Sequence, residues 1–263
     1  MQYSVTALRK LIAGAAAALA ILVSSEPNLV AAAAPVPPSG SVRFLDHHGP
    51  VLHAVQLHLI YWGSAWTATG VVSPSPDQIT TAMRTVMAGP YLTGLAQYRG
   101  IGGGVVRGST VITVSDPPER FTDEDVTSFL DAQLDAGSAP GPDPDNQTVY
   151  VVVMPTGIHS GDTTFVGEHN YYTRHGQRIH FVWTADSGSL ASATRIMSHE
   201  VVESATDPEG SAILGVSGTC SPGGWCEIAD ICPATGVLDG ITVAAYWSNL
   251  AGGCVVPTSP NQQ

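Results

Sequence analysis

Lysine is almost missing from this chain of 263 residues. Lys10 is the single lysine, every other basic residue is an arginine, and the formal net charge at pH 7 is −12. Phosphate backbones and anionic lipid head groups are bound by clustered positive charge, and the sequence contains no such cluster. The composition therefore argues against a nucleic-acid partner and against attachment to an anionic membrane surface.

Long apolar runs are missing as well, except near the N-terminus. Residues 11–23 are an uncharged run, preceded by Arg9 and Lys10 and followed by small residues at 31–34. This pattern is typical of an export signal, and the run is shorter than the ~20 residues that a membrane span needs. We predict a signal peptide at 1–33 that is cleaved near residue 33, and a secreted protein without a membrane span in the mature chain.

The remainder, about 230 residues, is enough for one large domain or two small ones. Residues 34–50 begin with "APVPPSG" and are predicted to be a proline-rich leader. Residues 51–263 contain no internal repeat, so we predict a single secreted domain with a disulfide-bearing C-terminal part.

Cysteine is missing from the first three quarters of the sequence. The four cysteines are Cys220, Cys226, Cys232 and Cys254. In an exported protein such a set indicates two disulfides, and among the three possible pairings we favour Cys220–Cys226 with Cys232–Cys254. A four-thiolate zinc site is the alternative, but the paired C-x-x-C spacing is absent. The sequence also lacks the G-x-S-x-G turn of serine hydrolases. The clustered cysteines argue against a free thiol, so neither a serine nor a cysteine nucleophile is indicated.

The secondary structure that the sequence predicts is mixed. An almost continuous apolar run at 148–155 is typical of a central strand that is covered on both faces. Ser75 and Thr122 are typical helix caps, and Pro208 ends a further helix over 190–206. The other predicted strands are 55–63, 109–116, 178–184 and 240–247. We therefore predict one α/β or α+β domain, with a mixed β-sheet flanked by a few helices.

One short stretch carries recognisable chemistry, "SHEVVESATDP". His199 and Glu203 are four residues apart, so on a helix both can bind one ion, as on the active-site helix of zinc peptidases. Glu200 lies beside them, where a carboxylate can act as general base. A glutamate in place of a second histidine makes such a site more anionic, which weakens the catalytic interpretation without removing it. An ordinary helix with a salt-bridged face, Glu200 pairing with Arg195, is the alternative.

A zinc site needs a third protein ligand. Glu227, in "WCEIADIC", is our first choice, with Asp230 or Asp207 as carboxylates that orient the ligands. The alternative ligands are three histidines elsewhere in the chain, His169, His159 and His180. Zn²⁺ is the expected cofactor, and Ca²⁺ is the alternative because of the number of carboxylates.

Several segments in the same order resemble the Exordium or phosphate-induced protein family of plants and its secreted bacterial relatives. These are "YWGSAW", "PYLTGLAQY", "VYVVVMPTGIHSG", "FVGEHN", "SHEVVESATDP" and "EIADIC". The resemblance implies a secreted or wall-associated protein. It assigns the family's polar motif positions to His199, Glu200, Glu203, Asp207, Pro208, Glu227 and Asp230. It also matches His169, although Val166 and Glu168 depart from the family pattern around it.

Two functions follow as hypotheses. The first is a secreted zinc-dependent metallopeptidase-like hydrolase that acts on a peptide or a cell-wall or surface substrate. The second is a non-catalytic extracellular protein of the Exordium type, in which a metal or a carboxylate–histidine network stabilises the fold.

Overall fold

The computed structural model describes residues 42–67, 73–162, 165–185, 188–216 and 226–259. Residues Ala34–Gln263 form one compact unit, which is the one described below. The predicted signal peptide, residues 34–41 of the predicted leader and Cys220 lie outside the described residues. Within the described ranges, no helix is both long and apolar enough to cross a bilayer.

Among the described residues, five strands form a mixed sheet in the order β3-β2-β5-β8-β7. The strands are β2 (Gln56–Trp62), β3 (Val105–Ile112), β5 (Thr148–Val153), β7 (Gly167–Arg174) and β8 (Gln177–Thr184). Neighbours pair in parallel except β7, which runs antiparallel to β8. All six residues of β5 are buried, as expected for a central strand. The predicted mixed α/β architecture is confirmed.

Three helices begin at polar caps, and two of these, Ser75 and Thr122, were predicted from the sequence. Ser75 and Gln78 form a capping box at the start of α1 (Pro76–Ala88), and Thr122 and Asp125 form another before α2 (Asp123–Asp135). Ser189 caps α3 (Leu190–Thr206), and Pro208 follows its end. The helix predicted over about 190–206 is therefore confirmed.

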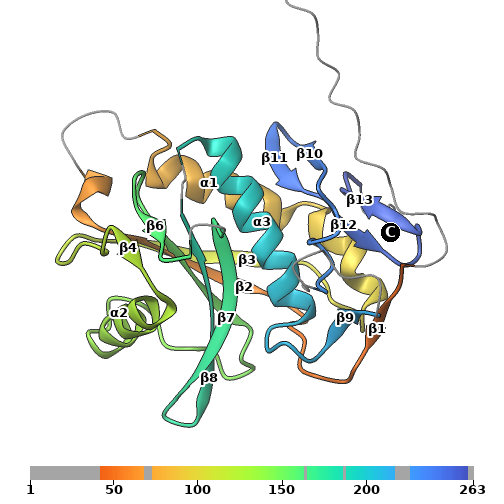
Figure 1. The fold of residues 1–263 in the computed structure, drawn as a ribbon, viewed down its shortest axis with the longest axis horizontal. Helices are drawn as coiled ribbons and strands as arrows, with labels where there is room; N and C mark the ends of the chain where they lie inside the picture. The colour runs from red at the N-terminus through yellow and green to blue at the C-terminus, as the bar shows by residue number, and fades with distance from the viewer. Residues whose placement is uncertain (1–41, 68–72, 163–164, 186–187, 217–225, 260–263) are drawn as a thin grey trace, which may run out of the picture. The chain divides into compact units, whose positions relative to one another are not determined.

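The helices cover the two faces of the sheet, and each face has its own apolar core. Val149, Val151 and Val153 of β5 pack on one side in a cluster with apolar residues of α1 and α3. Tyr150 and Val152 point the other way, into a cluster with apolar residues of α2. Figure 1 shows α3 and α2 on either side of the β7–β8 pair. The alternation follows from the two-residue period of a strand.

Short elements complete the unit. The 3₁₀ helices are η1 (Ser64–Thr67) and η2 (Tyr91–Gln97), and the short strands are β1 (Phe44–Asp46), β4 (Arg120–Phe121), β6 (His159–Ser160), β9 (Ile213–Gly215), β10 (Thr235–Leu238), β11 (Ile241–Ala244), β12 (Tyr246–Ser248) and β13 (Gly253–Val255). They pair as β1–β9, β4–β6, β10–β11 and β12–β13.

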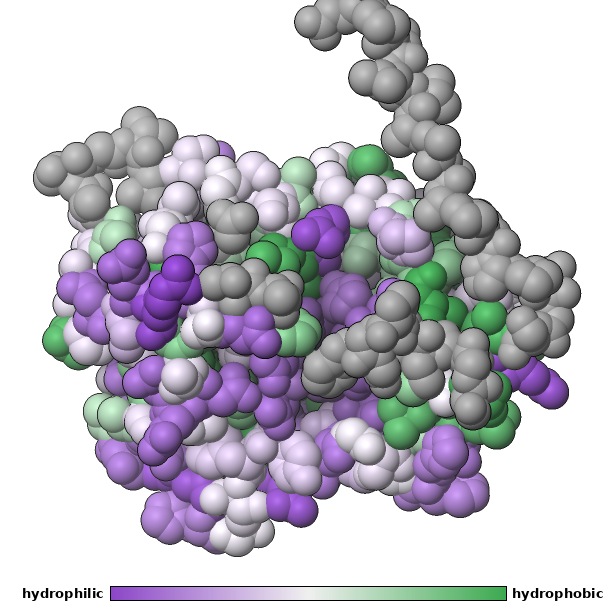
Figure 2. Space-filling model, viewed as in Figure 1, coloured by the Kyte–Doolittle hydropathy of each residue, from purple (hydrophilic) through white to green (hydrophobic). Residues whose placement is uncertain are grey.

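On the face shown in Figure 2, hydrophilic residues prevail around α2, β7 and β8, and hydrophobic ones gather beside β1, β9, β12 and β13.

Three sequence-based boundaries change. The predicted strand 240–247 is two strands, β11 and β12, which pair with different partners. β3 begins at Val105, four residues before the predicted start. The packed unit also begins before residue 51, because β1 pairs with β9 and Phe44 is buried in the core.

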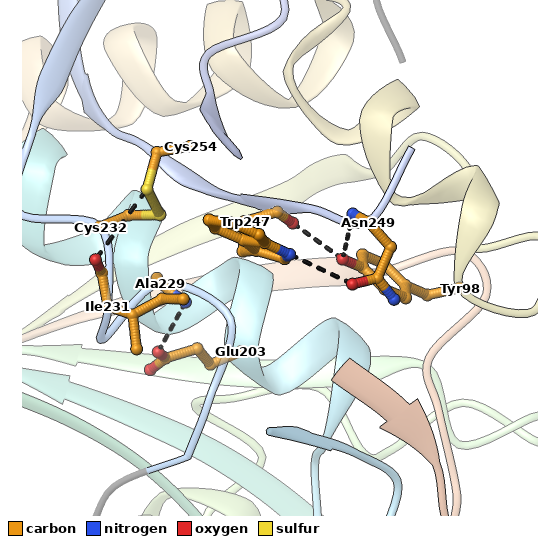
Figure 3. The surroundings of a disulfide bond; sticks show 8 residues. All are labelled: Tyr98, Glu203, Ala229, Ile231, Cys232, Trp247, Asn249 and Cys254. Carbon is orange, nitrogen blue, oxygen red and sulfur yellow. Dashed lines mark hydrogen bonds between the residues drawn. A yellow bond between two sulfur atoms is a disulfide. The ribbon is translucent and has the colours of Figure 1, made fainter. Parts of the chain in front are cut away.

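A disulfide joins Cys232 to Cys254, so this half of the predicted pairing is confirmed. Figure 3 shows it beside the turn that carries Ala229 and Ile231. Tyr98 donates a hydrogen bond to the carbonyl of Trp247, at 2.9 Å, which ties the neighbouring strand to η2. The pairing predicted for Cys220 involves a residue outside the described ranges.

Candidate metal centre

Helix α3 has an apolar side and an acidic side. Ala193, Met197, Val201 and Ala205, spaced by four, belong to the core. The acidic side carries Glu200 and the i, i+4 pair His199 and Glu203, whose Nε2 and Oε2 atoms lie 3.2 Å apart. Helix α3 thus places three residues of the predicted motif, His199, Glu200 and Glu203, on one side.

Strand β7 adds a second histidine next to this helix. Gly167 and His169 lie on the same face of β7, because successive side chains alternate. A Cβ at position 167 would lie 2.4 Å from Cγ2 of Ile196 and 2.8 Å from Oε1 of Glu200. The missing side chain therefore allows α3 to lie close to β7, and this places His169 against the acidic side of the helix.

Between these elements lies a cavity of about 720 Å³. Its lining is rich in carboxylates and includes Glu168, His169, His199, Glu200, Glu203, Asp207, Glu209, Glu227 and Asp230. Apolar parts of the wall come from Phe165, Pro208 and Leu214. A concave site with convergent polar groups is the usual form of a ligand or active site.

The first group of possible metal ligands is His199, Glu203 and Asp230, whose donor atoms lie within 4.8 Å of one another. Nε2 of His199 is 3.6 Å from Oδ1 of Asp230. One imidazole nitrogen and two carboxylate oxygens are ligands that Zn²⁺ accepts.

Glu203 is oriented by the turn at 228–231. Its Oε1 accepts a hydrogen bond from the backbone N–H of Ala229, at 3.2 Å (Figure 3). Oε2 is left to face His199, and also Nδ1 of His169 at 3.9 Å. Because Glu203 is only 2% exposed, this orientation holds a carboxylate in the interior rather than in water.

The second group is His169, Glu200 and Glu203, again with donor atoms within 4.8 Å of one another. Nδ1 of His169 faces Oε2 of Glu200 at 3.6 Å. Nε2 of the same ring is 3.2 Å from Oε1 of Glu227 and 3.2 Å from the carbonyl oxygen of Asp207. The two nitrogens of His169 thus face different partners, and the acidic residues of α3 lie on the Nδ1 side.

The electrostatics of the cavity reflect this crowding. Burial, only partly offset by His199, raises the pKa of Glu203 to about 7. Burial would lower the pKa of His199, but the carboxylates of Glu203 and Asp230 outweigh it, so this pKa lies well above 6.5. For His169, burial is likewise outweighed, chiefly by Glu227 and Glu200, and the pKa is raised. Without a cation, the carboxylates therefore favour the charged form of both imidazoles.

Two carboxylate oxygens in this region are buried without a partner among the described residues, Oδ2 of Asp207 and Oδ2 of Asp230. Asp207 is fully buried, and its Oδ1 accepts hydrogen bonds from the N–H groups of Ser211 and Ala212 at 2.5 and 2.7 Å. Burial raises the pKa of Asp207. Unpaired buried oxygens are costly, and a bound cation is one means of satisfying them.

Glu168 belongs to a separate carboxyl pair at the cavity wall. Asn170 donates to Oδ2 of Asp123 at 3.0 Å and to Oε1 of Glu168 at 3.3 Å. Burial and the negative charge of Asp123 raise the pKa of Glu168 to about 7. Its side chain is therefore directed toward the start of α2 rather than to the histidine groups.

The predicted ligands come together, with a different third partner. Glu227, our first choice beside His199 and Glu203, lies next to His169, and Asp230 completes the group around His199. His169, an alternative ligand in the sequence analysis, is central to the second group. His159 is exposed on β6 and does not line the cavity. His180 lies on β8 with its Nε2 3.2 Å from Oε1 of Glu209.

Sequence reasoning missed strand β7 itself, and with it the reason for His169 being near α3. The signal that was available is the Gly-x-His spacing at 167–169, which places a missing side chain and an imidazole on one face of a strand.

Searches against protein-family models, curated proteins and solved structures found no match. The resemblance to the Exordium family stays a prediction from the motifs quoted above.

Proposed function

We propose that this protein is a secreted, zinc-dependent hydrolase of the metallopeptidase type, related to the Exordium family. The observation that supports this best is the convergence of His199, Glu203 and Asp230, from α3 and a distant turn, with Glu200 beside them in one cavity. An imidazole, two carboxylate ligands and a further carboxylate beside them are the parts that metal-assisted hydrolysis requires.

The residues fit a divalent cation. His199, Glu203 and Asp230 would hold it, and the unpartnered Oδ2 of Asp230 is a further oxygen at the same place. When bound, Zn²⁺ supplies Lewis acidity, polarising a substrate carbonyl and making water more acidic.

Glu200 is the proposed general base. It is 6% exposed, it lines the cavity, and it lies one position from the ligand His199 on the helix. From there its carboxylate accepts a proton from the attacking water and returns it to the leaving group. His169, held between Glu200 and Glu227, lines the same cavity.

The proposed substrate is a neutral or basic peptide. Carboxylates outnumber cationic groups in the cavity lining, so an anionic substrate would be repelled. The apolar wall of Phe165, Pro208 and Leu214 offers a surface for an uncharged side chain.

The test compares Glu200→Gln with the matched control Glu119→Gln, whose side chain is exposed between β3 and α2. Zinc content is measured by elemental analysis, and cleavage is measured with casein and a peptide library. We expect Glu200→Gln to keep its zinc and to lose about 10²–10⁴-fold in rate, the usual contribution of a general base. Glu119→Gln should behave like the wild type.

A second function is favoured by the anchoring of the ligands. The hydrogen bond from Ala229 to Glu203 links α3 to the segment that the Cys232–Cys254 disulfide fixes, so a cation here would also brace the C-terminal part. In that case the protein binds one or more ions, loses stability when they are chelated and cleaves no peptide. Binding of no metal at all would overturn both functions.

A further inference from the structure

The two groups of ligands share one residue. Glu203 belongs to both, and its Oε2 lies 3.2 Å from Nε2 of His199 and 3.9 Å from Nδ1 of His169. Each imidazole has its own additional carboxylate, Asp230 for His199 and Glu200 for His169. A single cation on His199 leaves the His169 group with its donor atoms still facing one another.

The charge of the surrounding carboxylates also favours two bound cations. Both histidines must be uncharged to bind metal, and the carboxylates that contact their rings are then Glu200, Glu203, Glu227 and Asp230. Further carboxylates, including those of Asp207 and Glu209, line the same cavity, so a single divalent cation leaves an excess of negative charge there. An excess of buried negative charge is costly, so it favours occupation of both groups.

His169 is also oriented as a metal ligand usually is. Its Nε2 side faces the Glu227 carboxylate and the Asp207 carbonyl, both at 3.2 Å. Hydrogen bonding there fixes the proton on Nε2 and leaves the Nδ1 lone pair toward Glu200 and Glu203. The fully buried Asp207, whose Oδ2 has no partner among the described residues, lines the same cavity.

We propose that the cavity binds a second divalent cation on His169, Glu200 and Glu203, and that this cation inhibits the hydrolase. Inhibition rests on the proposed function, whereas binding does not. With its carboxylate occupied by the cation, Glu200 no longer accepts a proton from water. Zinc thus activates at low concentration and inhibits at higher concentration.

Zinc binding to the metal-stripped protein is measured by equilibrium dialysis over a range of free Zn²⁺, with elemental analysis of the ion content per chain. We expect two ions for the wild type and one for His169→Ala. The matched control His159→Ala, which changes an exposed histidine outside both groups, should bind two. One ion in the wild type, or two in His169→Ala, overturns the second site and leaves the proposed function intact.

A second, more conservative variant tests the same site without removing the imidazole. Glu227→Gln keeps the size of the side chain that orients His169, and we expect it to weaken the second binding step about 10–100-fold while leaving the first unchanged. Equal loss in both steps, or in neither, contradicts the assignment. Peptide cleavage is followed over the same zinc range, and inhibition should appear with the second ion. Two bound ions with cleavage undiminished would overturn the inhibitory role alone.

Discussion

Two pairs of histidines, one pair half-buried and the other buried, have opposite electrostatic environments in this molecule. In the cavity, His169 and His199 have raised pKa values, because the neighbouring carboxylates outweigh burial. In the central sheet, His58 on β2 and His180 on β8 have lowered pKa values, because burial prevails. The sheet pair is thus adapted to the neutral imidazole, and the cavity pair to a positive charge.

The difference lies in the partners, since all four rings are largely buried. His58 contacts a neutral hydroxyl, Oγ1 of Thr110 at 3.0 Å from its Nε2. His180 has one carboxylate, Glu209, which Arg178 also binds at 3.3 Å. The cavity histidines each face several carboxylates, and in the described part of the chain these ion pairs involve no arginine. A buried acidic site without its own arginine is suited to a metal cation.

The largest effect is expected from Glu203→Gln. This change removes a carboxylate beside the cavity histidines, so their surroundings become more like those of the sheet histidines. The amide oxygen can still accept from Ala229, but both ligand groups lose their shared carboxylate. We expect zinc affinity to fall by more than about 100-fold, since even outer partners of ligands contribute about 10–100-fold. The pKa of His199 should fall in the metal-free protein, which NMR titration measures.

The control for this variant is Glu209→Gln, which removes the carboxylate beside the sheet histidine His180. Glu209 lines the cavity but belongs to neither ligand group, so zinc affinity should change little. Similar losses in the two variants would mean that total negative charge, rather than the two ligand groups, holds the metal.

Removal of the disulfide should affect the cavity and spare the sheet. Cys232 and Cys254 are 22 residues apart in sequence, and loss of a bond closing such a loop costs about 3 kcal/mol in free energy of unfolding. The double variant Cys232→Ser, Cys254→Ser should show this loss in urea denaturation. Because Asp230 lies in the segment that the bond fixes, zinc affinity should fall as well, while the pKa of His58 stays unchanged. A changed His58 pKa would contradict the separation of the two regions.

A smaller effect is expected where the two regions meet, at Gly167. A Cβ there would overlap Ile196 and Glu200, so Gly167→Ala should cost about 1–3 kcal/mol through overpacking. Glu200 should be displaced, and the second zinc-binding step weakened more than the first. Gly103→Ala is the control, because a Cβ at that position meets no atom within 4 Å. Its effect should stay within about 0.5 kcal/mol.

Short sequence patterns predicted much of the secondary structure. Of the candidate site they predicted only the part on one helix, His199 and Glu203. The caps at Ser75 and Thr122 and the helix stop at Pro208 involve neighbours in sequence, so they predicted the helices. The spacing of His199 and Glu203 is local in the same sense. Which of Glu227 and Asp230 approaches His199 depends on a non-helical turn at 228–231, for which no periodicity applies. The approach of β7 to α3 depends on tertiary packing at Gly167, which no single segment reveals.

The smallest effect concerns the sheet histidine His58 and appears only in acid. Its folded pKa lies below the unfolded value of 6.5, so the unfolded chain binds the proton more readily. This group therefore leaves stability unaffected above pH 6.5 and removes stability as pH falls through the window below it. His58→Gln keeps a partner for Thr110 and cannot take up the proton, so its free energy of unfolding should decline less between pH 7 and 5. The exposed His47→Gln is the control, and urea denaturation at a series of pH values measures both. Equal acid sensitivity of the wild type and His58→Gln would show that the sheet histidine is not held neutral, and the contrast with the cavity would then fail.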